Sequence, residues 1–326
     1  MATYKDIHGF KIQDVSSDPP ASFTGQVWYN STSGALKVDA GTPVGAWATG
    51  GAMNTGRTQL AGAGIQTAAL GFGGREGAPA YAYSVLTESY NGTSWTEVND
   101  LNTGRTELGG AGTNTSALAF GGETPTVTAN TEQWNGTNWT EVNNLNTGRS
   151  ILAGSGASNT SALAFGGYNN PVGTYALTEK WNGTNWTEVN DMNTPRGGLA
   201  GCGTQTAALA FGSTQPITYH YAETWNGTNW TIVNDTNEDK GIRGGAGTNT
   251  SALAFGGQPY STGATESWNG TNWTELADLS TARYGPGGAG ASNSSAVAFG
   301  GNIGGPPTTA TEEWNLTGGV STIETS

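Results

Sequence analysis

The 326-residue chain has little of what most metalloenzymes and membrane proteins use. It contains one cysteine, Cys202, and two histidines, His8 and His220. An internal disulfide and a cysteine- or histidine-rich metal site are therefore excluded. No apolar run reaches the roughly 18 residues that a membrane-spanning helix needs. No stretch of a dozen residues keeps a helical apolar period free of Gly, Pro, Asn and β-branched residues, so we expect no long helices.

Charge is also scarce, and what is present is mostly negative. Only 11% of the residues are charged, and 12 Lys and Arg against 25 Asp and Glu give a net charge of −13. Because nucleic acids and anionic lipids attract basic surfaces, we expect neither nucleic acid binding nor membrane insertion. The first twenty residues contain no apolar segment of a secretory signal, so we expect synthesis in a cytosol, and an extracellular role would require non-classical export or release by lysis.

Glycine and aromatic residues are abundant, and they recur in six units. The chain has 53 Gly, 12 Trp and 11 Tyr. An ALAFGG-like segment places its Phe at positions 72, 120, 165, 211, 255 and 299, with spacings of 44 to 48 residues. A TE-x-W segment and an N-G-T-(N/S)-W-T segment follow in most units. Such a period is typical of repeat architectures and propellers.

Each unit contains four short strand patterns separated by turn residues. In the second unit they are LGGAGT, SALAFGG, TEQWNG and WTEVNNL. Both faces of SALAF are apolar or small, as expected for a sheet covered on both sides, and the GGAG strand suits close backbone approach at a crowded axis. The Asn-Gly turn favours a hairpin. We therefore predict an all-β fold, a six-bladed β-propeller preceded by a short β-hairpin extension.

The pattern also predicts the domain boundaries and the closure of the ring. The sixth unit has its TEEW strand but no following Trp-containing strand, while Trp47 aligns with the fourth-strand Trp of the other units. We expect the strand around Trp47 to complete the last blade, with residues 1–45 as an attachment segment and 46–326 as the propeller. The C-terminal GGVSTIETS is a second candidate for the closing strand.

The six units resemble kelch repeats. The Gly-Gly pair after the second strand, the Trp that opens the fourth strand and the arginine before the next blade match that family over roughly residues 46–316. The unit with Phe211-Gly212-Ser213 departs from the pattern because it lacks the second glycine. The resemblance implies a six-bladed propeller and by itself assigns no activity.

The first 45 residues carry a different resemblance. The run GQVWYNSTSGALKV, residues 25–38, predicts a hairpin and is similar to a GxxWYN…LKV element of bacteriophage tail-fibre and virion structural proteins. This resemblance implies that residues 1–45 bind other virion proteins and that the protein belongs to a particle. The alternative is an ordinary hairpin that caps the propeller.

One arginine per unit precedes the first strand. These are Arg57, Arg105, Arg149, Arg196, Arg243 and Arg283. In the favoured interpretation each is structural and pairs with the repeated Glu of TE-x-W or satisfies backbone groups. In the alternative they form a ring that binds an anionic ligand such as a sulfated or carboxylated sugar.

The segments after Phe-Gly-Gly differ between units and hold most of the tyrosines. Since exposed Tyr stacks on sugars and anchors protein partners, we take these residues as candidate ligand-binding residues, although they could instead pack the loops. They are Tyr81, Tyr83, Tyr168, Tyr175, Tyr219, His220, Tyr221 and Tyr260.

No catalytic constellation, metal site or cofactor motif is present in the sequence. Of the acids outside the repeats, Glu76 and Glu123 are noted only because a glycosidase needs two carboxylates in one pocket. We therefore expect no enzyme and no cofactor. The leading hypothesis is a phage virion protein, a tail fibre, baseplate or capsid decoration, whose propeller binds a host-surface glycan or a protein. The alternatives are a free bacterial lectin or adhesin, and a glycan-active enzyme.

Overall fold

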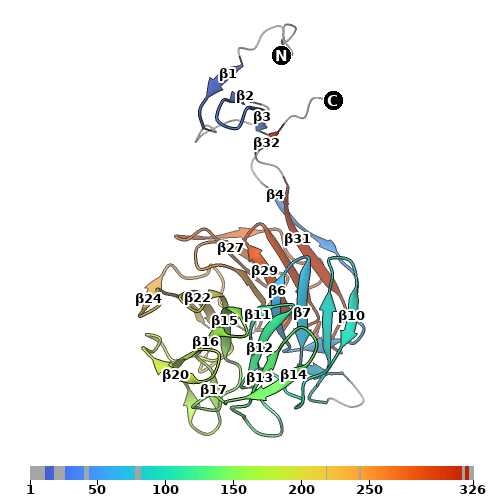
Figure 1. Ribbon diagram of the computed structural model, residues 1–326, viewed down its shortest axis with the longest axis vertical. Coiled ribbons are helices and arrows are strands. Elements are labelled where there is room, and N and C mark those ends of the chain that lie inside the picture. Colours follow the sequence, from blue (N-terminus) through green and yellow to red (C-terminus); the bar gives the residue numbers. More distant parts are fainter. Residues whose placement is uncertain are drawn as a thin grey trace. The chain divides into compact units, whose positions relative to one another are not determined.

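Figure 1 shows a computed structural model of the chain, and it describes residues 12–17, 26–39, 44–77, 82–217, 219–241, 244–317 and 320–322. The chain divides into two compact units. One comprises Met1–Ala46 and Leu316–Ser326, and the other Trp47–Asn315. All regular elements in the described ranges are strands, which confirms the all-β prediction.

The larger unit is a six-bladed β-propeller whose blades are four-stranded sheets. Blade 1 contains β6 (Ala61–Ile65), β7 (Ala68–Phe72), β9 (Thr87–Tyr90) and β10 (Trp95–Val98). Blade 2 contains β11 (Gly109–Thr113), β12 (Ser116–Phe120), β13 (Thr131–Trp134) and β14 (Trp139–Val142). Blade 3 contains β15 (Ala153–Ser158), β16 (Ser161–Phe165), β19 (Thr178–Trp181) and β20 (Trp186–Val189).

The other three blades repeat this order. Blade 4 contains β21 (Ala200–Thr204), β22 (Ala207–Ser213), β23 (Tyr219–Trp225) and β24 (Trp230–Val233). Blade 5 contains β25 (Gly244–Gly247), β26 (Ala252–Phe255), β27 (Thr265–Trp268) and β28 (Trp273–Leu276). Blade 6 contains β29 (Gly287–Ser292), β30 (Ser295–Phe299), β31 (Thr311–Thr317) and β4 (Val44–Thr49). Two further pairs lie outside the blades, β5 (Arg57–Thr58) with β8 (Arg75–Glu76) and β17 (Tyr168–Asn169) with β18 (Gly173–Thr174).

The first strands of the blades surround the axis and approach each other by their backbones. Each lies beside the first strand of the next blade, and β29 of blade 6 lies beside β6 of blade 1, so the ring is complete. A Cβ added to Gly154 would lie 2.6 Å from the carbonyl oxygen of Gly110 in the neighbouring blade. Glycine is therefore required where these strands meet.

The hydrophobic core lies between blades rather than within them. Phe120 of blade 2 packs on Trp186 of blade 3 with ring centroids 5.0 Å apart. The same contact recurs at all six blade boundaries: Phe72–Trp139, Phe120–Trp186, Phe165–Trp230, Phe211–Trp273, Phe255–Trp47 and Phe299–Trp95. Because every blade shares its core with both neighbours, an isolated blade would leave apolar surface in water.

The sixth blade is built from both ends of the propeller sequence. Strand β4 is its fourth strand, beside β31. Trp47 packs 5.1 Å from Phe255 and donates its Nε1–H to Thr265 Oγ1 at 2.9 Å. The alternative closing segment is used elsewhere, since β32 (Val320–Thr322) pairs with β3 (Ala35–Asp39). The expected propeller range of 46–326 is therefore corrected, because residues 316–326 belong to the smaller unit.

The smaller unit contains the predicted hairpin. Strand β2 (Val27–Asn30) pairs antiparallel with β3, β1 (Gln13–Val15) pairs parallel with β2, and β32 completes a four-stranded sheet. Trp28 on β2 is fully buried, whereas the adjacent Tyr29 is exposed. This alternation gives the sheet one buried face, on which Asn30 lies with Trp28.

One hydrogen bond of the repeating core is missing in blade 4. Five fourth-strand tryptophans donate Nε1–H to a third-strand threonine hydroxyl of the preceding blade. Trp273 instead packs in a cluster with Ala222, and its Nε1 is buried with no hydrogen-bond partner among the described residues. A buried unpaired donor of this kind costs stability.

Supplying the missing hydroxyl should therefore stabilise the propeller. We expect Ala222→Thr to have a free energy of unfolding higher than that of Ala222→Val by about 1–3 kcal/mol, since the two side chains share a shape and only threonine can accept from Trp273. Urea unfolding of the two variants measures the difference. Equal stability of the two would contradict the account.

Candidate functional site

Two sets of loops meet at one face of the propeller, which we call the loop face. One set joins the last strand of a blade to the first strand of the next, and the other joins the second and third strands within a blade. Single bridges connect them, as between Thr106 and Glu123. Equivalent pairings join Thr58 to Arg75, Ser150 to Tyr168, Gly197 to Gln215, Gly241 to Gln258 and Tyr284 to Asn302. Any ligand contacted by the divergent loops would therefore bind at this face.

The repeated arginines are buried and paired. Arg105, fully buried, donates to Glu132 at 3.0 Å and to the carbonyl oxygens of Gly121 and Asn130. The other described pairs are Arg57–Glu88, Arg149–Glu179, Arg196–Glu223 and Arg283–Glu312. Each of these arginines is fully buried. The geometry supports the structural interpretation, because none of these five guanidinium groups is accessible to an anionic ligand.

Burial acts on the ionisation of these arginines, and the paired glutamates oppose it. Burial lowers the pKa of Arg57, while the charge of Glu88 raises it. The same opposition holds for Arg105, Arg196 and Arg283 with their own glutamates. Each glutamate also accepts a backbone N–H from the loop before its blade, as Glu132 does from Asn102 at 2.7 Å. The pair therefore ties a loop to a blade as well as balancing charge.

The arginine position before blade 5 differs from the prediction. Arg243 lies outside the described residues, and Lys240 occupies the place equivalent to the arginines. The carbonyl of Lys240 accepts from Ser213 N–H, as the carbonyl of Arg149 accepts from Gly122. The signal was present in the sequence, because every described arginine of the set, and Lys240, follows a fourth-strand tryptophan by ten residues. Arg243 follows Trp230 by thirteen.

The candidate tyrosines occupy different environments. Tyr81 and the side chain of Tyr219 lie outside the described residues. Tyr168, Tyr175 and Tyr221 are half-buried, so their rings are only partly accessible to a ligand. His220 contacts the carboxylates of Asp235 and Asp239.

Tyr83 belongs to a polar cluster formed by loops of blades 1 and 2. Its hydroxyl donates to Glu123 Oε1 at 3.3 Å, and the Arg75 guanidinium lies 5.7 Å from the centre of its ring. Burial and the charge of Glu123 raise the pKa of Tyr83. Glu123, noted in the sequence only as an acid outside the repeats, thus has a defined partner.

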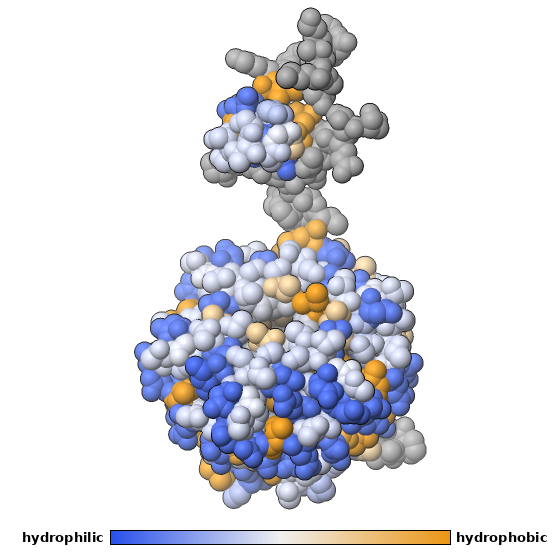
Figure 2. All heavy atoms as spheres, viewed as in Figure 1, coloured by the Kyte–Doolittle hydropathy of each residue, from blue (hydrophilic) through white to orange (hydrophobic). Residues whose placement is uncertain are grey.

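Exposed apolar side chains stand at the tips of four consecutive loops. Figure 2 shows a largely hydrophilic propeller surface with isolated hydrophobic residues in that view. The loops between second and third strands of blades 3 to 6 each carry one, namely Val172, Ile217, Tyr260 and Ile303. Tyr260 is 89% exposed and Val172 70%. We call these four residues the loop-tip cluster, and only Tyr260 was among the predicted residues.

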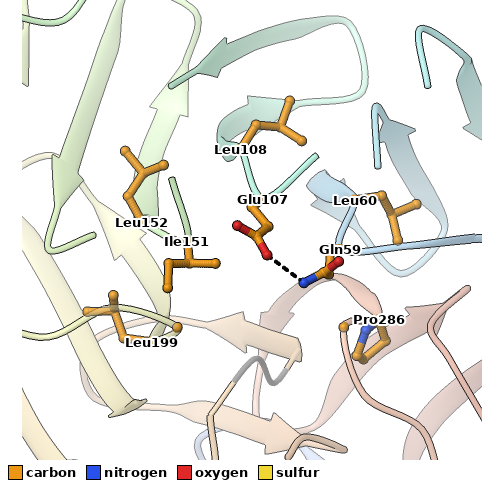
Figure 3. Close-up of a pocket in the computed structure, with 10 residues that line it drawn as sticks. Gln59, Leu60, Glu107, Leu108, Ile151, Leu152, Leu199 and Pro286 are labelled. Atoms are coloured by element: carbon orange, nitrogen blue, oxygen red, sulfur yellow. Dashed lines mark hydrogen bonds between the residues drawn. The ribbon is translucent and has the colours of Figure 1, made fainter. Parts of the chain in front are cut away.

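The loops between blades end in a ring around the axis (Figure 3). Gln59, Glu107 and Ile151 have φ of 55°, 57° and 44°, and Gly198 and Gly285 occupy the same left-handed region. The N–H of Glu107 donates to the Gln59 carbonyl at 3.0 Å, and the N–H of Ile151 donates to the Glu107 carbonyl at 2.9 Å. A β-branched residue with positive φ is strained, and such strain is characteristic of functional sites.

These residues line a pocket of about 100 Å³ at the mouth of the axial channel, together with Leu60, Leu108, Leu152, Leu199 and Pro286. Figure 3 shows the Glu107 carboxylate directed at Gln59, whose Nε2 donates to Glu107 Oε1 at 2.7 Å. Burial raises the pKa of Glu107 to about 7, and the charge of Glu123 adds to the rise, while hydrogen bonds from Ser150 and Gln59 oppose it. Near neutral pH this carboxyl can therefore donate or accept a hydrogen bond.

Glu107 was not singled out from the sequence, although a signal existed. The second residue after the arginine position takes four identities over the six units, and only one of the six residues is charged. The six residues are Gln59, Glu107, Ile151, Gly198, Ile242 and Gly285. Variation at one position of a repeated loop is a mark of a residue free to serve function rather than packing.

The single cysteine and the potential metal-ligating side chains form no further candidate site among the described residues. Cys202 is buried, and burial raises the pKa of its thiol to about 12, so it stays protonated at neutral pH. Within the described ranges no three His, Cys, Asp or Glu side chains group as a metal site. Over the same residues no helix long and apolar enough to span a membrane occurs.

Comparison with known proteins shows the fold alone. No protein-family model matches the chain, and no curated protein sequence matches it. Among solved structures, that of YjhT is similar, with a TM-score of 0.67 over 84% of this chain and 99% of the YjhT chain at 13% identity. At that identity the similarity supports the propeller architecture and carries no activity to this chain.

The buried pairs give a prediction on stability. Arg149→Met should lower the free energy of unfolding by about 3–5 kcal/mol, because Glu179 is left charged and unpaired in the interior. Arg149→Met/Glu179→Gln should recover part of the loss, since the neutral amide oxygen still accepts from Asn146. Chemical unfolding measures both, and a negligible effect of Arg149→Met would contradict a structural role.

Glu107 gives a second prediction, on pH. Its folded pKa of about 7 exceeds the ordinary value of 4.5, so between these values the folded state binds more protons than the unfolded state. This group therefore lowers stability as pH rises through that window. Glu107→Gln lacks the effect, and its stability relative to wild type should increase from about pH 5 to about pH 8. Parallel pH profiles from chemical unfolding would show that Glu107 titrates normally.

Proposed function

We propose that this chain is a non-catalytic virion protein that attaches a particle to a host surface. The smaller unit joins the chain to other virion proteins, and the propeller presents its loop face to a host-surface glycan or protein. The protein is made in the host cytoplasm and released by lysis. Its place in the particle is a tail fibre, a baseplate or a capsid decoration.

The loop-tip cluster is the observation that carries the binding role. Apolar side chains scattered singly over a surface need no explanation. Here four of them occupy the tips of equivalent loops at one face, three aliphatic and one aromatic. Exposed apolar and tyrosine side chains supply contact area to a partner or to the apolar face of a sugar.

The contrast between scaffold and loops supports the same role. The buried Arg–Glu pairs and inter-blade aromatic contacts recur almost unchanged, while the loops after Phe-Gly-Gly differ in length and composition. A rigid scaffold that holds divergent loops at one face is the arrangement used by binding proteins. The GxxWYN…LKV resemblance of residues 25–38 supports the attachment role of the smaller unit.

A glycan-active enzyme remains the second candidate because of one observation. Glu107 has a raised pKa, and the charge of Glu123 contributes to it. Two acids that break the repeat near one pocket are what glycoside hydrolysis requires. This candidate predicts cleavage of a bound glycan that Glu107→Gln abolishes, whereas the attachment role predicts binding without cleavage.

The attachment role is tested with a glycan array and host cells. The full-length protein should bind a defined glycan class or the cell surface, and Val172→Ser/Ile217→Ser/Tyr260→Ser/Ile303→Ser should lose that binding by about tenfold or more, because apolar contact area is removed. The control is Ile65→Ser, at an exposed apolar residue at the end of the first strand of blade 1. Binding that is equal in wild type and the quadruple variant would exclude the loop-tip cluster, and absence of the protein from purified particles would exclude the virion role.

A further inference from the structure

The pocket of about 100 Å³ at the mouth of the axial channel, which we call the axial pocket, contains a carboxylate without an ion pair. Glu107 is the one charged side chain among the described residues that line it. Glu107 is half-buried rather than fully buried, so a ligand in the pocket can reach its side chain. The repeated glutamates differ, since each described pair resembles that of Glu132 with the buried Arg105 at 3.0 Å. Glu107 forms no such pair with a described residue.

The charged groups around Glu107 leave the axial pocket negative. Burial raises the pKa of Glu107, the charge of Glu123 adds to the rise, and the charge of Arg75 opposes it. The uncharged Ser150 and Gln59 donate hydrogen bonds to the same carboxyl. Two acids and one base give one net negative charge when Glu107 is ionised, and the whole chain carries −13. This charge distribution attracts a cation.

The size of the axial pocket limits what part of a ligand it can hold. Sites for whole small molecules usually enclose about 300–1,000 Å³. A cavity of about 150 Å³ is needed to bind a molecule as small as benzene. A volume of about 100 Å³ is therefore too small to enclose a sugar ring. It is sufficient for the end of a slender chain.

The acceptors of the axial pocket match the donors of a primary ammonium group. Figure 3 shows the Glu107 carboxylate next to the Gln59 amide, whose Nε2 donates to Glu107 Oε1 at 2.7 Å. This orientation leaves Gln59 Oε1 as a second acceptor. A primary ammonium has three N–H donors and no acceptor, so it can donate to both side chains. Ile151 and Pro286 line the same pocket and offer apolar contact to the adjacent methylene groups.

The backbone holds these acceptors in position before any ligand binds. Gln59 and Glu107 have φ of 55° and 57°, a region that residues other than glycine seldom adopt. The N–H of Glu107 donates to the Gln59 carbonyl at 3.0 Å, and the N–H of Ile151 donates to the Glu107 carbonyl at 2.9 Å. Three consecutive inter-blade loops are thereby tied together at the mouth of the channel. Such preorganisation lowers the entropy lost on binding.

We propose that the axial pocket binds a primary ammonium group carried on an unbranched aliphatic chain. This is the chemistry of a lysine side chain on a protein partner and equally that of a free aliphatic amine. The ammonium is a compact point charge on a flexible stem, whereas a guanidinium is planar and broader, so the small pocket favours the ammonium. An anion is repelled by Glu107 and Glu123.

The axial pocket contains no residue of the loop-tip cluster, so this inference does not rest on the attachment role. The two are also distinguished by experiment. The loop-tip quadruple variant should keep amine binding while it loses host binding, and Glu107 variants act on amine binding.

The test uses the full-length protein with n-butylamine, Nα-acetyl-lysine methylamide and the uncharged n-butanol. Ligand-observed NMR and calorimetry at pH 8 should detect binding of an amine and none of the alcohol. Glu107→Gln keeps the shape of the side chain and an acceptor for Gln59, so it should fold, and it should weaken amine binding by about tenfold or more. The matched control is Glu141→Gln, which removes the same charge from an exposed position on β14 and should leave affinity unchanged.

The pH dependence is a readout that a purely structural role of Glu107 would not move. Aliphatic amines stay charged below about pH 9, because their ordinary pKa is about 10.4. The pKa of Glu107 is about 7. Amine affinity of the wild type should therefore fall by about tenfold or more from pH 8 to pH 5, as Glu107 takes up a proton. In Glu107→Gln the affinity should not change over that range.

The two amines distinguish the sources of the ligand. Tighter binding of the lysine derivative assigns a lysine side chain of a protein partner, because its peptide groups then add contacts at the loop face. Equal or tighter binding of butylamine assigns a free amine.

Four outcomes would overturn the proposal. They are no binding of either amine, butanol affinity as high as that of butylamine, equal amine affinity of wild type and Glu107→Gln at pH 8, and wild-type affinity that stays constant from pH 8 to pH 5. Loss of amine binding in the loop-tip quadruple variant would move the site away from the axial pocket. Amine binding by a protein that binds no host surface would overturn the attachment role alone.

Discussion

The buried Arg–Glu pair is the interaction on which the rest of the propeller depends. A pair removed from water stabilises only when its geometry is good and its remaining polar atoms are satisfied. Here the arginine also binds carbonyl oxygens and the glutamate also accepts from a loop, as with Arg105 and Glu132. One pair thus fixes the loop that enters a blade, the turn after its second strand and its third strand. This fixed base lets the loop tips vary without loss of the fold.

The second constraint is that the apolar core is shared between blades. Phe120 lies in a core cluster with Leu145 and Leu152, and Trp186 of the next blade packs on its ring. Without β4 the sixth blade would lack its fourth strand, and Phe255 of blade 5 would be left uncovered. Trp47 on β4, from the start of the propeller sequence, packs on Phe255. Closure by a strand from the other end of the sequence therefore follows from packing and also holds the two ends of the propeller together.

Near-identity of the blades makes each departure informative. The missing threonine at Ala222 leaves Trp273 Nε1 without a hydrogen-bond partner among the described residues, and in the same blade Arg196 keeps its ion pair with Glu223 at the longer distance of 3.3 Å. At the axis, Glu107 stands alone as an acid in a ring of otherwise uncharged residues. A repeated scaffold tolerates such local losses because the other copies hold the ring.

By itself the sequence determined the all-β class, the number of blades, the strands of each unit and the hairpin at residues 25–38, because these follow from local periodicity and turn chemistry. Counting ten residues from each tryptophan would also have placed Lys240 in the arginine set. Which side chains contact one another was decided only by the tertiary structure. Burial raises the pKa of Glu107 and the charge of Glu123 adds to the rise, while the hydrogen bond from Gln59 opposes it, and these three residues come from different loops. Burial and charge act through space, so they are set by which loops the closed ring brings together.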